Sequence, residues 1–164
     1  MNDLFSLAGK NILITGSAQG IGFLLATGLG KYGAQIIIND ITAERAELAV
    51  EKLHQEGIQA VAAPFNVTHK HEIDAAVEHI EKDIGPIDVL VNNAGAMTKA
   101  PFLDMAFDEW RKIFTVDVDG AFLCSQIAAR QMVKQGQGGR IINITSVHEH
   151  TPLPDASAYT AAKH

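Results

Sequence analysis

The stretch NILITGSAQGIG, residues 11–22, gives the clearest indication of the fold class of this chain. Its first five residues, Asn11 to Thr15, form a short apolar run typical of a buried strand, and a helical pattern follows from Gly20 to Tyr32. Three glycines between them let the backbone turn sharply and approach an anion without a Cβ in the way. The unpaired N–H groups and partial positive charge of the helix N-terminus then favour a pyrophosphate; the alternative is a tight turn without a ligand. The predicted contacts are Gly16, Ser17, Gln19, Gly20, Ile21 and Gly22.

The rest of the chain alternates in the same way between short apolar runs and amphipathic stretches. Further strands are predicted at 35–39, 59–65, 87–91 and 140–145, and helices at 42–56, 69–84, 107–135 and from Ala156 onward. Continuous apolar strands separated by helices are typical of a parallel sheet that is covered on both faces. Because crossover connections are right-handed, the sequence predicts an α/β fold with a doubly wound, Rossmann-like sheet of five strands. Residues 1–164 are expected to form a single domain.

Composition narrows the function classes. Apolar residues make up 47% of the chain and charged residues 20%, which is typical of a globular protein. The net charge of −6 argues against a nucleic-acid partner. No apolar segment is long enough to span a membrane, and the first ten residues do not resemble a signal peptide. The single cysteine, Cys124, forms no intrachain disulfide, so a cytoplasmic protein is expected.

A carboxylate follows the second predicted strand. Asp40 stands eighteen residues after Gly22, where it can accept hydrogen bonds from an adenosine ribose and repel a 2′-phosphate. Neither Gln19 nor Ile41 adds a positive charge there, so NAD is favoured as the cofactor over the alternative, NADP. Asp40 could instead be a solvated strand end or a helix cap.

Three motifs occur together along the chain. They are the glycine pattern of residues 15–22, Asn92-Asn93-Ala94-Gly95, and Ser146 thirteen residues before Tyr159-x-x-x-Lys163. In this combination the chain resembles the short-chain dehydrogenase/reductase family over its whole length. The resemblance implies hydride transfer between NAD(P) and a secondary alcohol or ketone, with a small polyol or keto acid as substrate. It also implies homo-oligomers among complete members.

The resemblance assigns roles to individual residues. Tyr159 would be the general acid or base, Lys163 would favour its phenolate and contact the nicotinamide ribose, and Ser146 would orient the substrate oxygen. The cofactor cleft would be lined by Asn66, Val67, Asn93, Ala94, Gly95, Tyr159 and Lys163. No metal is expected, although residues 148–150 read His-Glu-His, because no suitable third ligand lies close by.

Two positions depart from the family pattern. Asp117 stands where members usually carry an asparagine that supports a proton relay behind the lysine. Asp117 could keep the backbone part of that role. Its charge could instead pair with Lys163 and weaken the pull of the lysine on Tyr159. A third alternative is that it is a tolerated polar residue in a helix kink. Asn66 stands where an aspartate commonly contacts the adenine, and an amide can still donate and accept there.

Two halves of the sequence resemble different members of this family. Residues 1 to about 95 are similar to one member and the part from Met97 to another, with a crossover within residues 88–95, so the sequence predicts a chimera. Complete members continue with further strands and helices, so we expect a C-terminally incomplete, weakly active or inactive chain with a fraying last helix and an exposed fifth strand. The alternatives are a non-catalytic nucleotide-binding domain and an inactive truncated product.

Overall fold

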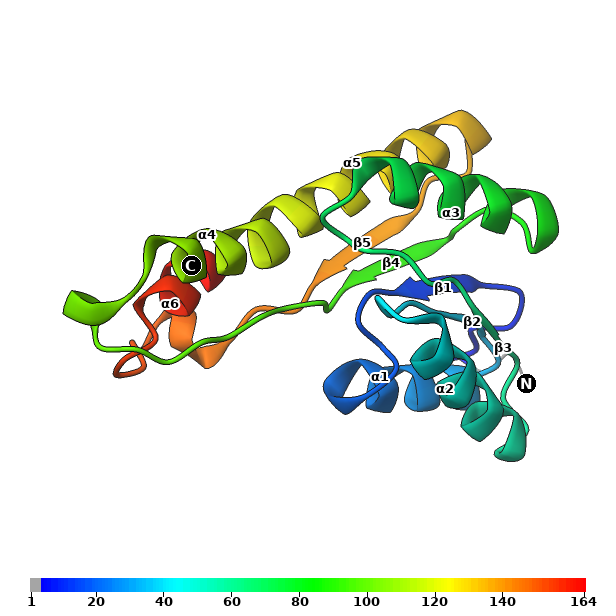
Figure 1. Cartoon of the computed structure of the whole chain (residues 1–164). Helices are drawn as coiled ribbons and strands as arrows, with labels where there is room; N and C mark the ends of the chain where they lie inside the picture. Colours follow the sequence, from blue (N-terminus) through cyan, green and yellow to red (C-terminus); the bar gives the residue numbers. More distant parts are fainter. Residues whose placement is uncertain (1–3) are drawn as a thin grey trace.

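The computed structural model describes residues 4–164 and confirms the predicted doubly wound sheet. Five parallel strands lie in the order β3-β2-β1-β4-β5 (Figure 1). The strands are β1 (Asn11–Ile14), β2 (Gln35–Ile38), β3 (Ala60–Ala62), β4 (Val89–Asn92) and β5 (Arg140–Asn143). Strand β3 is shorter than the predicted 59–65 because Pro64 has no N–H to donate to a neighbouring strand.

Helices cover both faces of this sheet. Helices α1 and α2 lie on one face, and α3 and α5 lie on the other (Figure 1). The helical segments are α1 (Gly20–Lys31), α2 (Ala43–Gln55), α3 (Lys70–Asp83), η1 (Phe102–Asp104), α4 (Phe107–Phe114), η2 (Thr115–Gly120), α5 (Ala121–Gln135), η3 (Val147–Glu149) and α6 (Ser157–Lys163). Among the described residues, no helix combines the length and apolar character that a membrane crossing requires.

Alternation along the central strand builds two cores. Ile12 and Ile14 pack in the core with residues of α1 and α2, whereas Leu13 packs with residues of α3 and α5. Successive side chains of a strand point to opposite faces, so one apolar run fills both cores. Cys124 lies in the second core, where burial raises the pKa of its thiol to about 12.

The stretch predicted as one helix over 107–135 contains a change of winding. The segment η2 is a π-helix between α4 and α5, and Gly136 ends the run in the left-handed conformation with φ of 74°. Such wider turns are frequent at functional sites. Here the π-helical turn carries Asp117, whose side chain is buried.

The fifth strand is exposed, as expected. Within residues 4–164, β5 pairs only with β4, and Ile141 and Ile142 are exposed. The last helix is formed as α6, which packs against α4 and η3 with Ala158 fully buried; its fraying stays a prediction.

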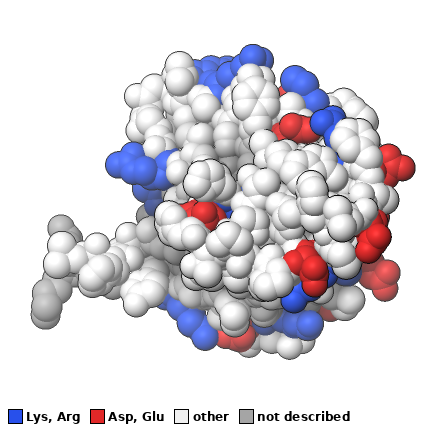
Figure 2. Space-filling model, turned by 90° about the vertical axis from the view of Figure 1, so that its left-hand side faces the viewer, with Lys and Arg blue, Asp and Glu red and all other residues white. Residues whose placement is uncertain are grey.

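The end of the molecule formed by η1 and α4 carries exposed apolar side chains. Phe102, Leu103 and Phe107 are all largely exposed there. The centre of the face seen in Figure 2 correspondingly shows few charged residues.

Candidate functional site

A cleft of ≈ 470 Å³ opens at the carboxyl ends of β1, β2 and β4. This is the point of the doubly wound sheet where the strand order reverses, and ligands of such sheets bind there. The structure places most of the predicted cofactor residues on its wall, and these are Gly16, Gln19, Gly20, Ile21, Asp40, Asn66, Val67, Asn93, Ala94 and Gly95.

The glycine-rich loop between β1 and α1 leaves no room for side chains at two positions. Gly16 has φ of +61°, and a Cβ there would lie 2.9 Å from the Cα of Ala94. A Cβ on Gly22 would lie 2.5 Å from Nδ2 of Asn93 and 2.8 Å from the carbonyl oxygen of Gly16. Helix α1 has no side-chain cap at Gln19 and no acidic residue in its first turn. Its first N–H groups are therefore suited to an anion, and this cradle fits the phosphates of a dinucleotide.

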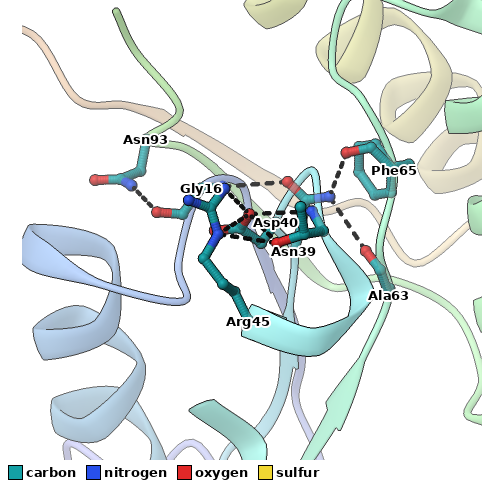
Figure 3. Close-up of polar contacts among 8 residues, drawn as sticks. Gly16, Asn39, Asp40, Arg45, Ala63, Phe65 and Asn93 are labelled. Atoms are coloured by element: carbon teal, nitrogen blue, oxygen red, sulfur yellow. Dashed lines mark hydrogen bonds and ion pairs between the residues drawn. The ribbon is translucent and has the colours of Figure 1, made fainter. Parts of the chain in front are cut away.

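Asn39 holds the loop from the side of β2 (Figure 3). Its side chain is buried; Oδ1 accepts a hydrogen bond from the amide of Gly16 at 3.1 Å, and Nδ2 donates to the carbonyls of Ala63 and Phe65 at 3.1 and 3.0 Å. One amide thus connects the glycine-rich loop to the segment after β3. Asn39 was not among the predicted site residues; the signal for it was a polar residue directly after the three isoleucines of β2.

Asn93 holds the same loop from the side of β4. Its Nδ2 donates to the carbonyls of Thr15 and Gly16 at 2.9 and 3.0 Å. The amides of Asn93 and Ala94 both donate to the hydroxyl of Thr15 at 3.0 Å. Thr15, a further residue outside the predicted set, therefore fixes the loop to the end of β4.

Ser17 lies behind the loop. Its hydroxyl is fully buried and donates to the carbonyl of Ile14 at 2.7 Å, and its amide donates to the carbonyl of Asn39 at 2.8 Å. Both polar groups are already paired within the protein, so Ser17 holds the shape of the loop.

Asp40 reaches the cleft with its charge already paired (Figure 3). Its Oδ1 accepts hydrogen bonds from Nη2 and Nε of Arg45 at 2.6 and 3.0 Å and from the amide of Thr42 at 3.2 Å. Neither Gln19 nor Ile41 adds a positive charge beside Asp40, but the first turn of α2 brings that of Arg45 to the cleft wall.

Asn66 and Val67 line the cleft beyond Asp40. The side-chain oxygen of Asn66 accepts hydrogen bonds from the amide and hydroxyl of Thr68 at 3.0 and 2.9 Å. The Asn66 amide donates to Glu72 at 2.7 Å; this bond, followed by the contact with His69, lowers the pKa of Glu72. These contacts order the turn that begins α3.

The tertiary structure brings Lys163 of α6 to Asp117 of η2. Lys163 Nζ lies 3.3 Å from Oδ2 of Asp117, donates to the carbonyl of Ile144 at 3.2 Å, and is 5.8 Å from the ring centre of Tyr159. Oδ1 of Asp117 accepts a hydrogen bond from the amide of Ala96 at 2.6 Å. Of the alternatives that the sequence left open for Asp117, the structure shows the ion pair with Lys163. Burial raises the pKa of Asp117, while the Ala96 amide and Lys163 act in the opposite direction.

Ser146 and Tyr159 lie on neighbouring elements. Ser146 begins η3, and its Oγ accepts a hydrogen bond from the amide of His148 at 3.2 Å. The His148 ring packs edge-on to Tyr159, with ring centres 6.5 Å apart. No hydrogen bond among residues 4–164 joins Ser146 directly to Tyr159.

Comparison with protein families identifies the class. Residues 10–164 match the short chain dehydrogenase family, so the chain belongs to this family. The chain is 71% identical over 163 residues to 5-keto-D-gluconate 5-reductase of Escherichia coli strain K12, covering 99% of this chain and 64% of that protein. It thus spans slightly less than two thirds of this curated relative.

Solved structures agree with the fold. A gluconate 5-dehydrogenase from Burkholderia cenocepacia J2315, crystallised with NADP and tartrate, matches with a TM-score of 0.91 and 41% identity over 97% of this chain and 62% of its own. The acetoin dehydrogenase YohF from Salmonella typhimurium matches with a TM-score of 0.84 and 54% identity over 94% of this chain and 62% of its own. These matches run across the expected crossover at residues 88–95, so the chimera stays a prediction.

Proposed function

We propose that this chain supplies the coenzyme-binding and catalytic residues of an NAD(P)-dependent oxidoreductase. The substrate class is a small polyol acid, whose keto group is interconverted with a secondary alcohol, as in 5-keto-D-gluconate. The observation that carries the proposal is the glycine-rich loop, held by Asn39 and Asn93 with the uncapped N-terminus of α1 behind it. The names of the similar proteins support the substrate class.

The cleft offers a separate region for each part of a dinucleotide. Residues 16–21 would hold the pyrophosphate, Asp40 the adenosine ribose, and Asn66 with Val67 the adenine. Residues 93–95 and Lys163 would contact the nicotinamide side. When bound, the nicotinamide ring donates or accepts the hydride.

Side chains of η3 and α6 would handle the proton. Tyr159 would move a proton to or from the substrate oxygen, and the ammonium group of Lys163 would stabilise the negative charge that develops during this transfer. The Ser146 oxygen already accepts from the His148 amide, so its hydroxyl proton stays available to donate to the substrate.

Coenzyme binding and turnover test this proposal in one preparation. We expect NADH and NADPH to quench protein fluorescence on titration. We also expect 5-keto-D-gluconate to cause weak coenzyme oxidation that Tyr159→Phe removes without loss of binding. The proposal would be overturned if neither NADH nor NADPH binds.

A second candidate function is nucleotide binding without catalysis. The Asp117–Lys163 pair favours it, because the carboxylate offsets the charge on which Tyr159 would depend. Binding of both coenzymes without any oxidation dependent on Tyr159 would support this candidate.

The influence of Asp117 on catalysis can be measured by turnover. Asp117→Asn removes a negative charge beside Lys163, whose Nζ lies 5.8 Å from the ring centre of Tyr159. We expect the Tyr159-dependent oxidation of NADH by 5-keto-D-gluconate to increase in this variant, because the charge of Lys163 is no longer offset.

The matched control is Asp119→Asn, which removes an exposed carboxylate from the same turn. This control is expected to leave the rate of coenzyme oxidation unchanged. Equal rates for the Asp117 and Asp119 variants would show that the charge of Asp117 does not affect catalysis by Tyr159.

A further inference from the structure

We propose that Arg45 is the specificity-determining residue at the adenosine end of the cleft and enables the chain to bind NADP as well as NAD. In this proposal the Arg45 guanidinium pairs with Asp40 when the ribose carries a 2′-hydroxyl. When the ribose carries a 2′-phosphate, the guanidinium binds the phosphate as well and keeps part of its contact with Asp40. The inference rests on the proposed coenzyme-binding function and names the residue that determines which of the two coenzymes can bind.

The first observation is the state of Asp40. A free carboxylate at the end of β2 would repel a 2′-phosphate by charge. Here its side chain is 7% exposed, and Oδ1 takes both donors of Arg45 together with the Thr42 amide. The positive charge of Arg45 offsets the carboxylate, so the cleft wall lacks the unpaired negative charge that excludes NADP.

The second observation is the position of Arg45. It follows the start of α2 by two residues and lines the same cleft as Gly16 and Asp40 (Figure 3). Its side chain is 49% exposed, in contrast to that of Asp40. One member of the pair is therefore held in the protein while the other extends into solvent, where its remaining N–H groups are accessible to a ligand.

The third observation concerns the N–H donors of Arg45 that Asp40 does not use. The contacts with Asp40 use Nε and Nη2, and a guanidinium carries five N–H donors in total. A phosphate can therefore be bound through Nη1 while Asp40 keeps part of its contact. Arginine is suited to this task because its planar group binds phosphate and carboxylate oxygens with two parallel hydrogen bonds.

Calorimetric titration of the full 164-residue chain tests this inference. The probes are NAD, NADP, 5′-AMP and adenosine 2′,5′-bisphosphate, because the last two report the adenosine end alone. In the parent chain we expect both dinucleotides to bind. Arg45→Gln should weaken binding of NADP and of the bisphosphate by about 10-fold or more, and binding of NAD and AMP by less than about 3-fold.

Three further variants sharpen the test. Lys52→Gln removes a positive charge from the last turn of the same helix and should change no affinity beyond the effect of net charge. Arg45→Lys keeps the charge and should retain a measurable part of the NADP affinity that Arg45→Gln loses. Asp40→Asn frees Arg45 and should raise the ratio of NADP to NAD affinity.

The outcomes separate this inference from the proposed function. Equal losses for NAD and NADP in Arg45→Gln, or stronger NADP binding, would overturn the role of Arg45 while leaving coenzyme binding intact. Absence of binding by all four probes to the folded parent chain would overturn both. Circular dichroism of each variant shows that the fold is retained.

Discussion

Asn39→Leu is expected to lower the free energy of unfolding by roughly 3–5 kcal/mol and to abolish nucleotide binding. Leucine has nearly the size of asparagine but leaves three groups without a partner, namely the Gly16 amide and the carbonyls of Ala63 and Phe65. Each unpaired buried group costs about 1–3 kcal/mol. Urea unfolding measures the first effect and calorimetric titration with NADH the second.

The control for Asn39→Leu is Gln55→Leu at the exposed end of α2. It makes the same kind of amide-to-leucine change, yet its expected effect on stability is within about 0.5 kcal/mol. Asn39→Asp separates the two sets of contacts. It keeps an acceptor for the Gly16 amide, but it replaces the donor to the carbonyls of Ala63 and Phe65 with an oxygen that repels them. A loss below about 1 kcal/mol in Asn39→Leu, with binding unchanged, would contradict the role given to Asn39.

Gly22→Ala is the second change with a large expected effect. The added methyl would lie 2.8 Å from both the carbonyl oxygen of Gly16 and the Cα of Ser17, so the backbone must move. Overpacking of this kind costs about 1–3 kcal/mol. Because the displaced loop is the proposed phosphate site, we expect NADH affinity to fall at least about 10-fold. Thermal unfolding and titration with NADH measure the two effects.

Gly28→Ala provides a matched control within the same helix. A Cβ at Gly28 has no neighbour within 4 Å, so the methyl enters open space. Alanine is the better helix former, and stability should rise by up to about 1 kcal/mol with NADH affinity unchanged. Similar behaviour of the two alanine variants would mean that close packing at Gly22 does not shape the site.

These two changes act on one physical arrangement. Asn39 and Asn93 hold the glycine-rich loop from opposite sides, and Gly22 allows the helix behind it to approach. The amides of the loop are thereby oriented before any ligand arrives, which reduces the entropy lost on binding. Preorganisation of this kind is the reason for expecting binding to be so sensitive to a residue that is itself buried.

Much of this cleft could be predicted from local sequence patterns. The apolar run of β1 and the glycines after it lie within about a dozen residues, so they can be recognised from the sequence. The right-handed crossover connections then restrict the order in which the strands lie in the sheet. Asp40 was found because it follows a strand at a known distance from the loop. Asn39 was missed because its importance depends on Ala63 and Phe65, which lie beyond the next helix.

The strands, the main helices, the glycine-rich turn and the family could be recognised from local patterns, because strand and helix periodicity and backbone freedom act over short stretches of chain. Which charges are paired depends on the folded chain. Arg45 reaches Asp40 around the first turn of α2, and Lys163 reaches Asp117 from a helix far along the chain. The strength of a charge depends on its distance from other charges and on its burial, and neither is fixed until the chain has folded.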